Sequence, residues 1–101
     1  MATSIIASGR TEPGATNWQV YSPTGIFVDV DTSSAGFRIG AIYVTSLGGN
    51  SSHWATTGGT SIYTPTATGF RVYVRWVDGG PLTPAQANQL GWHINWHAAG
   101  A

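Results

Sequence analysis

The stretch Gly91-Trp92-His93-Ile94-Asn95-Trp96-His97 alternates strictly between bulky apolar and polar side chains. Successive side chains of a β-strand point to opposite faces of its sheet. The two tryptophans and the isoleucine are therefore expected to pack into a core. The other face of the same strand carries three polar side chains that need solvent or a partner: His93, Asn95 and His97.

The overall composition restricts the partners that this chain can bind. Its 101 residues fit a single domain, 1–101. Only 8% of the residues are charged, the formal net charge is zero, and lysine is absent. Nucleic acid is not an expected partner, because phosphate binding needs clustered cations and the chain has only 4 basic residues, all arginine. A surface with so few charges favours self-association.

Several features are missing from the sequence. Cysteine is absent, which excludes disulfides and thiolate metal sites, and we expect no cofactor. Residues 1–4 lead into only two adjacent isoleucines, so we expect neither a conventional signal peptide nor insertion into a membrane. The compartment stays open: cytoplasmic synthesis followed by unconventional release, or by assembly into a virion, is compatible with the sequence.

Short β-prone runs separated by Gly, Pro, Ser and Thr predict an all-β fold, an antiparallel sandwich of about six strands. We place strands near residues 3–8, 16–22, 25–32, 38–47, 60–64, 69–77 and 90–98. One short helical turn is predicted near residues 83–89. Thr83 can cap it, Pro84 suits its first position, and Gln86 has the capping-box spacing.

The polar row of the last strand does not predict a metal site within one chain. Residues four apart on a strand are separated by roughly 13 Å at ~3.3 Å per residue, too far for His93 and His97 to share one ion. A threefold axis that gathers one histidine from each of three chains is a second possibility. We favour an outer face that makes contacts between chains or with water.

A second polar row, Arg71, Tyr73 and Arg75, lies on the predicted strand 69–77. We expect this strand to pair with strand 90–98, which would place the two rows side by side as an oligomer interface. Asp29 and Asp31, on the polar face of strand 25–32, are possible counterions. The i,i+2 spacing of these carboxylates does not define a catalytic geometry.

The predicted loop around His53-Trp54 is polar and rich in glycine. Sugar rings stack their C–H patches on aromatic side chains, while their hydroxyl groups bond to polar side chains. Asn50, His53, Trp54 and Asp78 supply those residue types. For Trp54 alone, the favoured interpretation is that its side chain folds back over the end of the sandwich. The sequence contains no recognisable catalytic motif, so we do not expect an enzyme.

The C-terminal part of the chain resembles the H-type lectin domain. The resemblance rests on the segments Ser61–Phe70, Arg71–Trp76 and Trp92–Trp96, with Gly40–Leu47 similar to the preceding core strand of that family. It implies a six-stranded antiparallel sandwich that forms trimers and binds galactose or N-acetylgalactosamine between protomers. Trp76 matches the family tryptophan beside the sugar.

Two departures from the family pattern concern the sugar site. Val77 stands where the best-known member has a polar residue, and the family's sugar-holding Asn and Arg fall near residues 55–57. The segment 83–89 also changes the rim of the groove. The candidate carbohydrate-binding residues are Asn50, His53, Trp54, Trp76 and Asp78.

Two functions follow from these expectations. The first is a non-enzymatic lectin-like protein that binds glycans of the galactose or N-acetylgalactosamine type as a homotrimer or a higher multiple of three. The alternative is a structural or adhesin trimerisation module of a phage, virus or extracellular appendage, in which both polar rows are buried between subunits.

Overall fold

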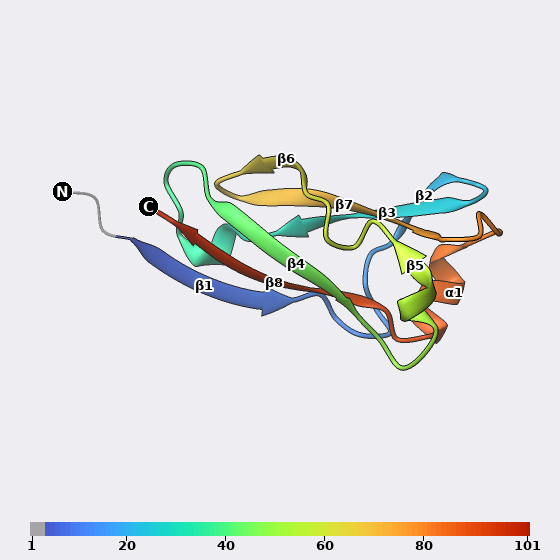
Figure 1. Ribbon diagram of the computed structural model, residues 1–101. Coiled ribbons are helices and arrows are strands. Elements are labelled where there is room, and N and C mark those ends of the chain that lie inside the picture. The colour runs from blue at the N-terminus through green and yellow to red at the C-terminus, as the bar shows by residue number, and fades with distance from the viewer. Residues whose placement is uncertain (1–3) are drawn as a thin grey trace.

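Two antiparallel sheets stack face to face in this protein (Figure 1). The structure is a computed structural model and describes residues 4–101. One sheet, the β8 sheet, has the strand order β1 (Ile5–Arg10), β8 (His93–Gly100) and β4 (Ile42–Gly48). The other, the β7 sheet, contains β2 (Gln19–Ser22), β3 (Gly25–Asp31), β7 (Gly69–Trp76), β5 (Thr56–Thr57) and β6 (Tyr63–Thr66). The predicted all-β sandwich is confirmed.

The strand boundaries follow the sequence pattern closely where alternation is strong. The last three long strands, β4, β7 and β8, begin and end within a few residues of the predicted segments. β5 was not predicted, because two residues are too short to show alternation. The predicted start of the first strand at residue 3 lies outside the described residues. Trp18 fell within a predicted strand, but it precedes β2 and lies buried in the core.

Trp92 and Trp96, from the alternating segment 91–97, lie at the centre of the core. Trp92 and Ile94 are both 0% exposed, and Trp96 is also buried. Their side chains face the buried apolar residues of the β7 sheet. These are Ile26, Val28 and Val30 on β3 and Phe70, Val72 and Val74 on β7. The predicted inward face of strand 90–98 is therefore confirmed.

Indole N–H groups tie this core to the loops around it. Trp92 Nε1–H donates to the Ser51 carbonyl at 2.9 Å, and Trp18 Nε1–H donates to the Trp92 carbonyl at 3.2 Å. Each buried N–H thus has an acceptor, as burial requires. These bonds fasten the segment before β2 and the loop after β4 to the start of β8.

The predicted pairing of strands 69–77 and 90–98 is wrong. β7 pairs with β3, β5 and β6, whereas β8 pairs with β1 and β4 in the opposite sheet. The connection between them contains the helix α1 (Pro84–Gln89) and crosses from one layer to the other (Figure 1). Alternation specifies which side chains of a strand are buried. It does not specify the sheet, because two strands that each have one apolar face can lie side by side in one sheet or face each other across the core.

The predicted helical turn is present as α1. The Thr83 side chain accepts a hydrogen bond from Gln86 N–H at 3.1 Å, Pro84 occupies the first helical position, and Ala87 is wholly buried. Gly91, at φ 69°, adopts the left-handed conformation directly after the helix, where a side chain would be strained. Within residues 4–101, no helix is long and apolar enough to cross a membrane.

Candidate functional site

A shallow pocket lies at the end of the sandwich where the loop after β4 meets the turn after β7. Its volume is about 430 Å³. The side chains of Trp54, Trp76 and Asp78, three of the five predicted sugar contacts, line it together. The remaining lining residues are Ser52, Ala55, Gly80 and Pro81. We call this hollow the Trp54 pocket.

The Trp54 side chain is 88% exposed, so the expectation that it folds back over the sandwich is wrong. It belongs to a 3-10 turn, His53–Ala55, that begins after Ser52 in the left-handed region at φ 69°. Thr56 Oγ1–H donates to the His53 carbonyl at 2.6 Å, and Val77 N–H donates to the Ala55 carbonyl at 2.9 Å. The turn is thus anchored to both neighbouring segments, and the indole projects from a fixed backbone.

Trp76 forms the rigid wall of the Trp54 pocket. Its ring meets the buried Trp92 edge to face, with centroids 5.0 Å apart, and its Nε1–H donates to the Pro81 carbonyl at 3.1 Å. Asp78 Oδ1 accepts the Gly80 N–H at 2.8 Å. Among residues 4–101, no protein group donates to Oδ2 of Asp78, so one carboxylate oxygen is available for a ligand.

Asn50 and His53 do not line the Trp54 pocket. Asn50 N–H donates to the Leu90 carbonyl at 2.8 Å, and a Cβ added to Gly91 would lie 2.8 Å from Asn50 Nδ2. His53 Nδ1 is buried without a hydrogen-bond partner in the described part of the chain, close to Gly49. The Asn50 side chain therefore lies against the connection before β8, and His53 Nδ1 lies within the loop after β4. A residue's side-chain direction in such an irregular loop follows no simple period, which is why the sequence did not separate these two residues from Trp54.

The row His93, Asn95 and His97 lies on the outer face of the β8 sheet. His93 Nδ1 is 2.9 Å from the Gly91 carbonyl, and Asn95 Nδ2–H donates to Ser46 Oγ at 3.3 Å. His97 is exposed and lies opposite Val44 on β4. In residues 4–101, no three His, Cys, Asp or Glu side chains are grouped so that they could hold a metal ion.

Exposed apolar side chains lie near His97 on this outer face, which has Val44 on one side of His97 and Ser8 on the other. Ile42 is 75% exposed and Val44 65% exposed, and Ile6 on β1 is similarly open. The register places Ile6 and Ile42 on either side of Ala99, one row away from His97. We call Ile6, Ile42, Val44, His97 and Ala99 the apolar strip. Several large apolar side chains exposed together on one sheet face are typical of a contact surface.

The row Arg71, Tyr73 and Arg75 lies on the outer face of the opposite sheet, so the two polar rows cannot form one continuous interface. Arg71 donates to Asp29 through Nε at 2.7 Å and through Nη2 at 2.9 Å. Its guanidinium also lies 4.2 Å from the centroid of the Phe27 ring. The predicted counterion Asp29 is confirmed, whereas Asp31 instead accepts the Ser33 N–H at 2.8 Å.

The Arg71–Asp29 pair makes a small contribution to stability that is lost at acidic pH. The hydrogen bond from Arg71, and then its charge, hold the pKa of Asp29 below the usual value of 3.8. Asp29→Asn should lower the free energy of unfolding at neutral pH by less than about 1 kcal/mol, because the pair is largely exposed. A depressed carboxyl pKa stabilises the fold above the unfolded-state pKa, so the difference between the proteins should disappear as the pH falls through the lowered value.

Urea unfolding at neutral pH and at about pH 2 measures this difference. Glu12→Gln is the control, since it removes the same charge at an exposed position where the structure shows no ion pair. A deficit of Asp29→Asn that persists unchanged at the acidic pH would show that the carboxylate contributes through packing and not through its charge.

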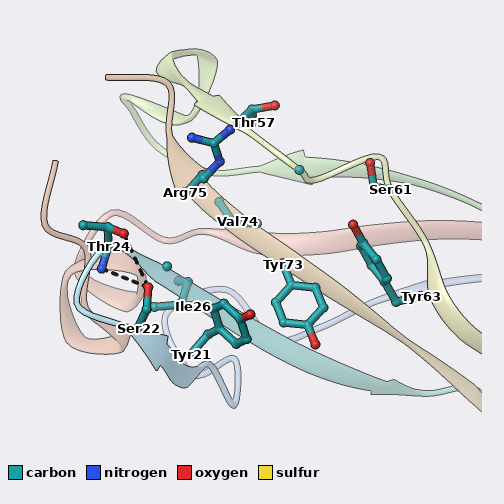
Figure 2. A pocket seen from close by; sticks show the side chains of 12 residues that line it. Tyr21, Ser22, Thr24, Ile26, Thr57, Ser61, Tyr63, Tyr73, Val74 and Arg75 are labelled. Carbon is teal, nitrogen blue, oxygen red and sulfur yellow. Dashed lines mark hydrogen bonds between the residues drawn. The ribbon is translucent and has the colours of Figure 1, made fainter. Parts of the chain in front are cut away.

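A second and larger hollow lies on the outer face of the β7 sheet, and the sequence did not indicate it (Figure 2). Its volume is about 550 Å³. Tyr21, Tyr63 and Tyr73 line it from β2, β6 and β7, together with Arg75. These strands are separated in the sequence, so only the sheet order brings the tyrosines together. The one feature of the sequence that could have indicated this hollow was the presence of outward-facing tyrosines on several predicted strands.

Comparison with models of known families gives no match for this chain, and comparison with curated proteins finds no relative. The function therefore has to be argued from the geometry of these surfaces.

Proposed function

We propose that this protein is a non-enzymatic carbohydrate-binding module that holds a sugar in the Trp54 pocket. The observation that carries the proposal is the 88% exposed indole of Trp54, held on an anchored turn beside the available carboxylate oxygen of Asp78. An exposed aromatic ring beside a fixed carboxylate in a hollow has the composition of a small-ligand site, whereas an exposed apolar residue alone would not indicate one.

The residue types of the pocket suit a pyranose ring. The flat indole of Trp54 offers an apolar surface for the C–H face of the ring. Asp78 accepts hydrogen bonds from hydroxyl groups, and Ser52 can donate or accept one. Trp76 cannot turn away from the ligand, because its ring and its N–H are both engaged by Trp92 and Pro81. An apolar wall with a few fixed polar groups is the general pattern of small-ligand sites.

The resemblance to H-type lectins supports a sugar site at this end of the sandwich and suggests which sugar it binds. Trp76 corresponds to the tryptophan beside the sugar in that family, whose ligands are galactose and N-acetylgalactosamine. In this chain the exposed Trp54 supplies an aromatic surface from the neighbouring loop. We therefore propose galactose-type glycans as the ligand class.

Self-association is the second candidate property, and the apolar strip favours it. The strip leaves Ile6, Ile42 and Val44 in solvent on one face, and only four arginines and four acidic residues are present to keep a monomer soluble. A homotrimer, or a higher multiple of three, would also raise the avidity of a weak single site for a glycan surface. An assembly module without sugar binding remains the alternative function.

Calorimetric titration with galactose and N-acetylgalactosamine, guided by a glycan array, tests the proposal. Trp54→Ala should weaken binding at least tenfold, or about 1.4 kcal/mol, because the ring loses its stacking surface. Asp78→Asn should weaken it as well, since a neutral amide accepts hydroxyl hydrogen bonds less strongly than a carboxylate. The proposal fails if the folded protein binds no neutral sugar, or if Trp54→Ala binds as well as the parent protein.

A further inference from the structure

The groove in Figure 2 has the dimensions of a ligand site and is separate from the Trp54 pocket. Its volume of about 550 Å³ lies within the range of roughly 300–1,000 Å³ that small-ligand pockets occupy. None of its lining residues also lines the Trp54 pocket.

Two glycines create the space beside Arg75. Gly25 on β3 lies directly opposite Arg75 on β7, so no side chain stands next to the guanidinium on that side. An irregularity in β2 places Ser22 opposite Gly25, and the row continues on the other side of Arg75 to Thr57. Gly58, at φ 104°, lets the segment after β5 approach the Tyr73 carbonyl so closely that a Cβ would overlap it. The groove is thus formed by the backbone and does not depend on a side chain moving away.

The tyrosines form a rigid aromatic wall. Tyr73 meets Tyr21 and Tyr63 edge to face, and in each pair the ring centroids are 5.0 Å apart. Phe27 extends the cluster, with its ring centroid 5.7 Å from that of Tyr73. Tyr21 and Tyr63 are both exposed. Edge-to-face contacts fix the ring orientations, so the open ring faces are available to a ligand at little entropic cost.

The charge in the groove is a single free cation. In residues 4–101, the one ion pair joins Arg71 to Asp29, so no carboxylate lies within ion-pair distance of Arg75. No aspartate or glutamate lines the groove. Within residues 4–101, the Arg75 side chain forms no ion pair, and Figure 2 shows it without a hydrogen bond to the other groove residues, which leaves its planar fork free for a bidentate carboxylate.

Hydroxyl groups line the rest of the groove. Ser22, Thr24, Thr57 and Ser61 contribute hydroxyl groups, and the three tyrosines contribute phenolic ones. Hydroxyl groups donate and accept, so they suit a ligand with many hydroxyl groups of its own. A nucleotide or a polyphosphate would need more than one cation, and a purely apolar peptide would leave Arg75 without a partner.

We propose that this groove is a second binding site, specific for an acidic sugar: a uronic acid residue whose ring lies on the tyrosines and whose carboxylate pairs with Arg75. This site is independent of the Trp54 pocket. Asp78 in that pocket repels an anion, whereas the groove attracts one. The protein would thus bind neutral sugars at the end of the sandwich and acidic sugars on its β7 face.

Galacturonic acid and galactose are the matched probes, since they share the ring hydroxyl configuration and differ in the carboxylate at C6. Titrations should use protein that already carries Trp54→Ala, so that binding to the Trp54 pocket is weakened at least tenfold. In this background galacturonate binding should persist, and Arg75→Gln should weaken it at least tenfold. Arg10→Gln is the matched control, because it removes an exposed arginine from β1 on the opposite sheet and should change nothing.

A second variant tests the aromatic wall. Tyr21→Ala should weaken galacturonate binding severalfold without unfolding the protein, because Tyr21 is exposed on the edge strand β2. Chemical shift changes on titration should centre on the groove residues.

Three results would overturn the proposal: no galacturonate binding by the parent protein, equal binding by Arg75→Gln and Arg10→Gln, or loss of self-association in Arg75→Gln in place of loss of sugar binding. Preferential binding of a proline-rich peptide over galacturonate would likewise reject the acidic sugar as the occupant. Failure of galactose to bind at the Trp54 pocket would reject only the function proposed above, since the two sites are measured separately.

Discussion

Trp92→Ala is expected to lower the free energy of unfolding by about 3–5 kcal/mol, the usual cost of removing a large aromatic side chain from a core. Trp92 is 0% exposed and meets Trp76 edge to face. Its N–H also holds the Ser51 carbonyl. The substitution therefore opens a cavity and leaves the Ser51 carbonyl without its donor. Chemical denaturation followed by circular dichroism measures the loss.

Trp54→Ala provides the control for that measurement, because it makes the same chemical change at an exposed site. Its expected effect on the free energy of unfolding is within about 0.5 kcal/mol. The two variants together separate the tryptophan that stabilises the fold from the one that we assign to the ligand. Similar losses in both variants would contradict this division and would mean that Trp54 packs against protein in solution.

Ile42→Glu combined with Val44→Glu is expected to convert an assembled protein into monomers. Both side chains lie on the apolar strip, 75% and 65% exposed in a single chain. In an assembly that buries the strip, every copy would bring two unpaired carboxylates into an apolar contact, which is costly. Sedimentation velocity at several concentrations measures the change in mass.

Val77→Glu is the matched control, since Val77 is also 65% exposed but lies beyond the end of β7. It should leave the assembly unchanged. If the parent protein is itself a monomer, both the association hypothesis and a sugar site between protomers are wrong. If the double variant stays assembled, the contact must use another face, and the outer face of the β7 sheet is the next to test.

The sequence predicted the elements whose pattern depends on local geometry. Alternation along 90–98 identified Trp92, Ile94 and Trp96 as core residues, and the Thr83, Pro84 and Gln86 spacing predicted α1. Strand faces identified Asp29 and Asp31 as possible counterions, and of these two Asp29 pairs with Arg71. In these cases the nearest neighbours along the chain, or the two faces of one strand, decide the outcome.

Features that depend on how strands are ordered could not be predicted in the same way. Strand 69–77 was assigned to the wrong neighbour, because its buried face fits either layer of a sandwich. Trp54 faces solvent because of a 3-10 turn and a left-handed Ser52, which its residue type does not indicate. The tyrosine groove depends on Gly25 lying opposite Arg75, a register that becomes visible only once β3 and β7 are paired.

The separation of the two polar rows onto opposite sheets has a consequence for how the protein would meet a surface. An assembly that buries the β8 face leaves the β7 face of every copy pointing away from the axis. Self-association and ligand binding would then use opposite faces of the two-layer sandwich, so substitutions that strengthen one need not weaken the other. Each added copy would contribute one more tyrosine groove on the outside of the assembly, and a polysaccharide would be bound through many weak contacts at once.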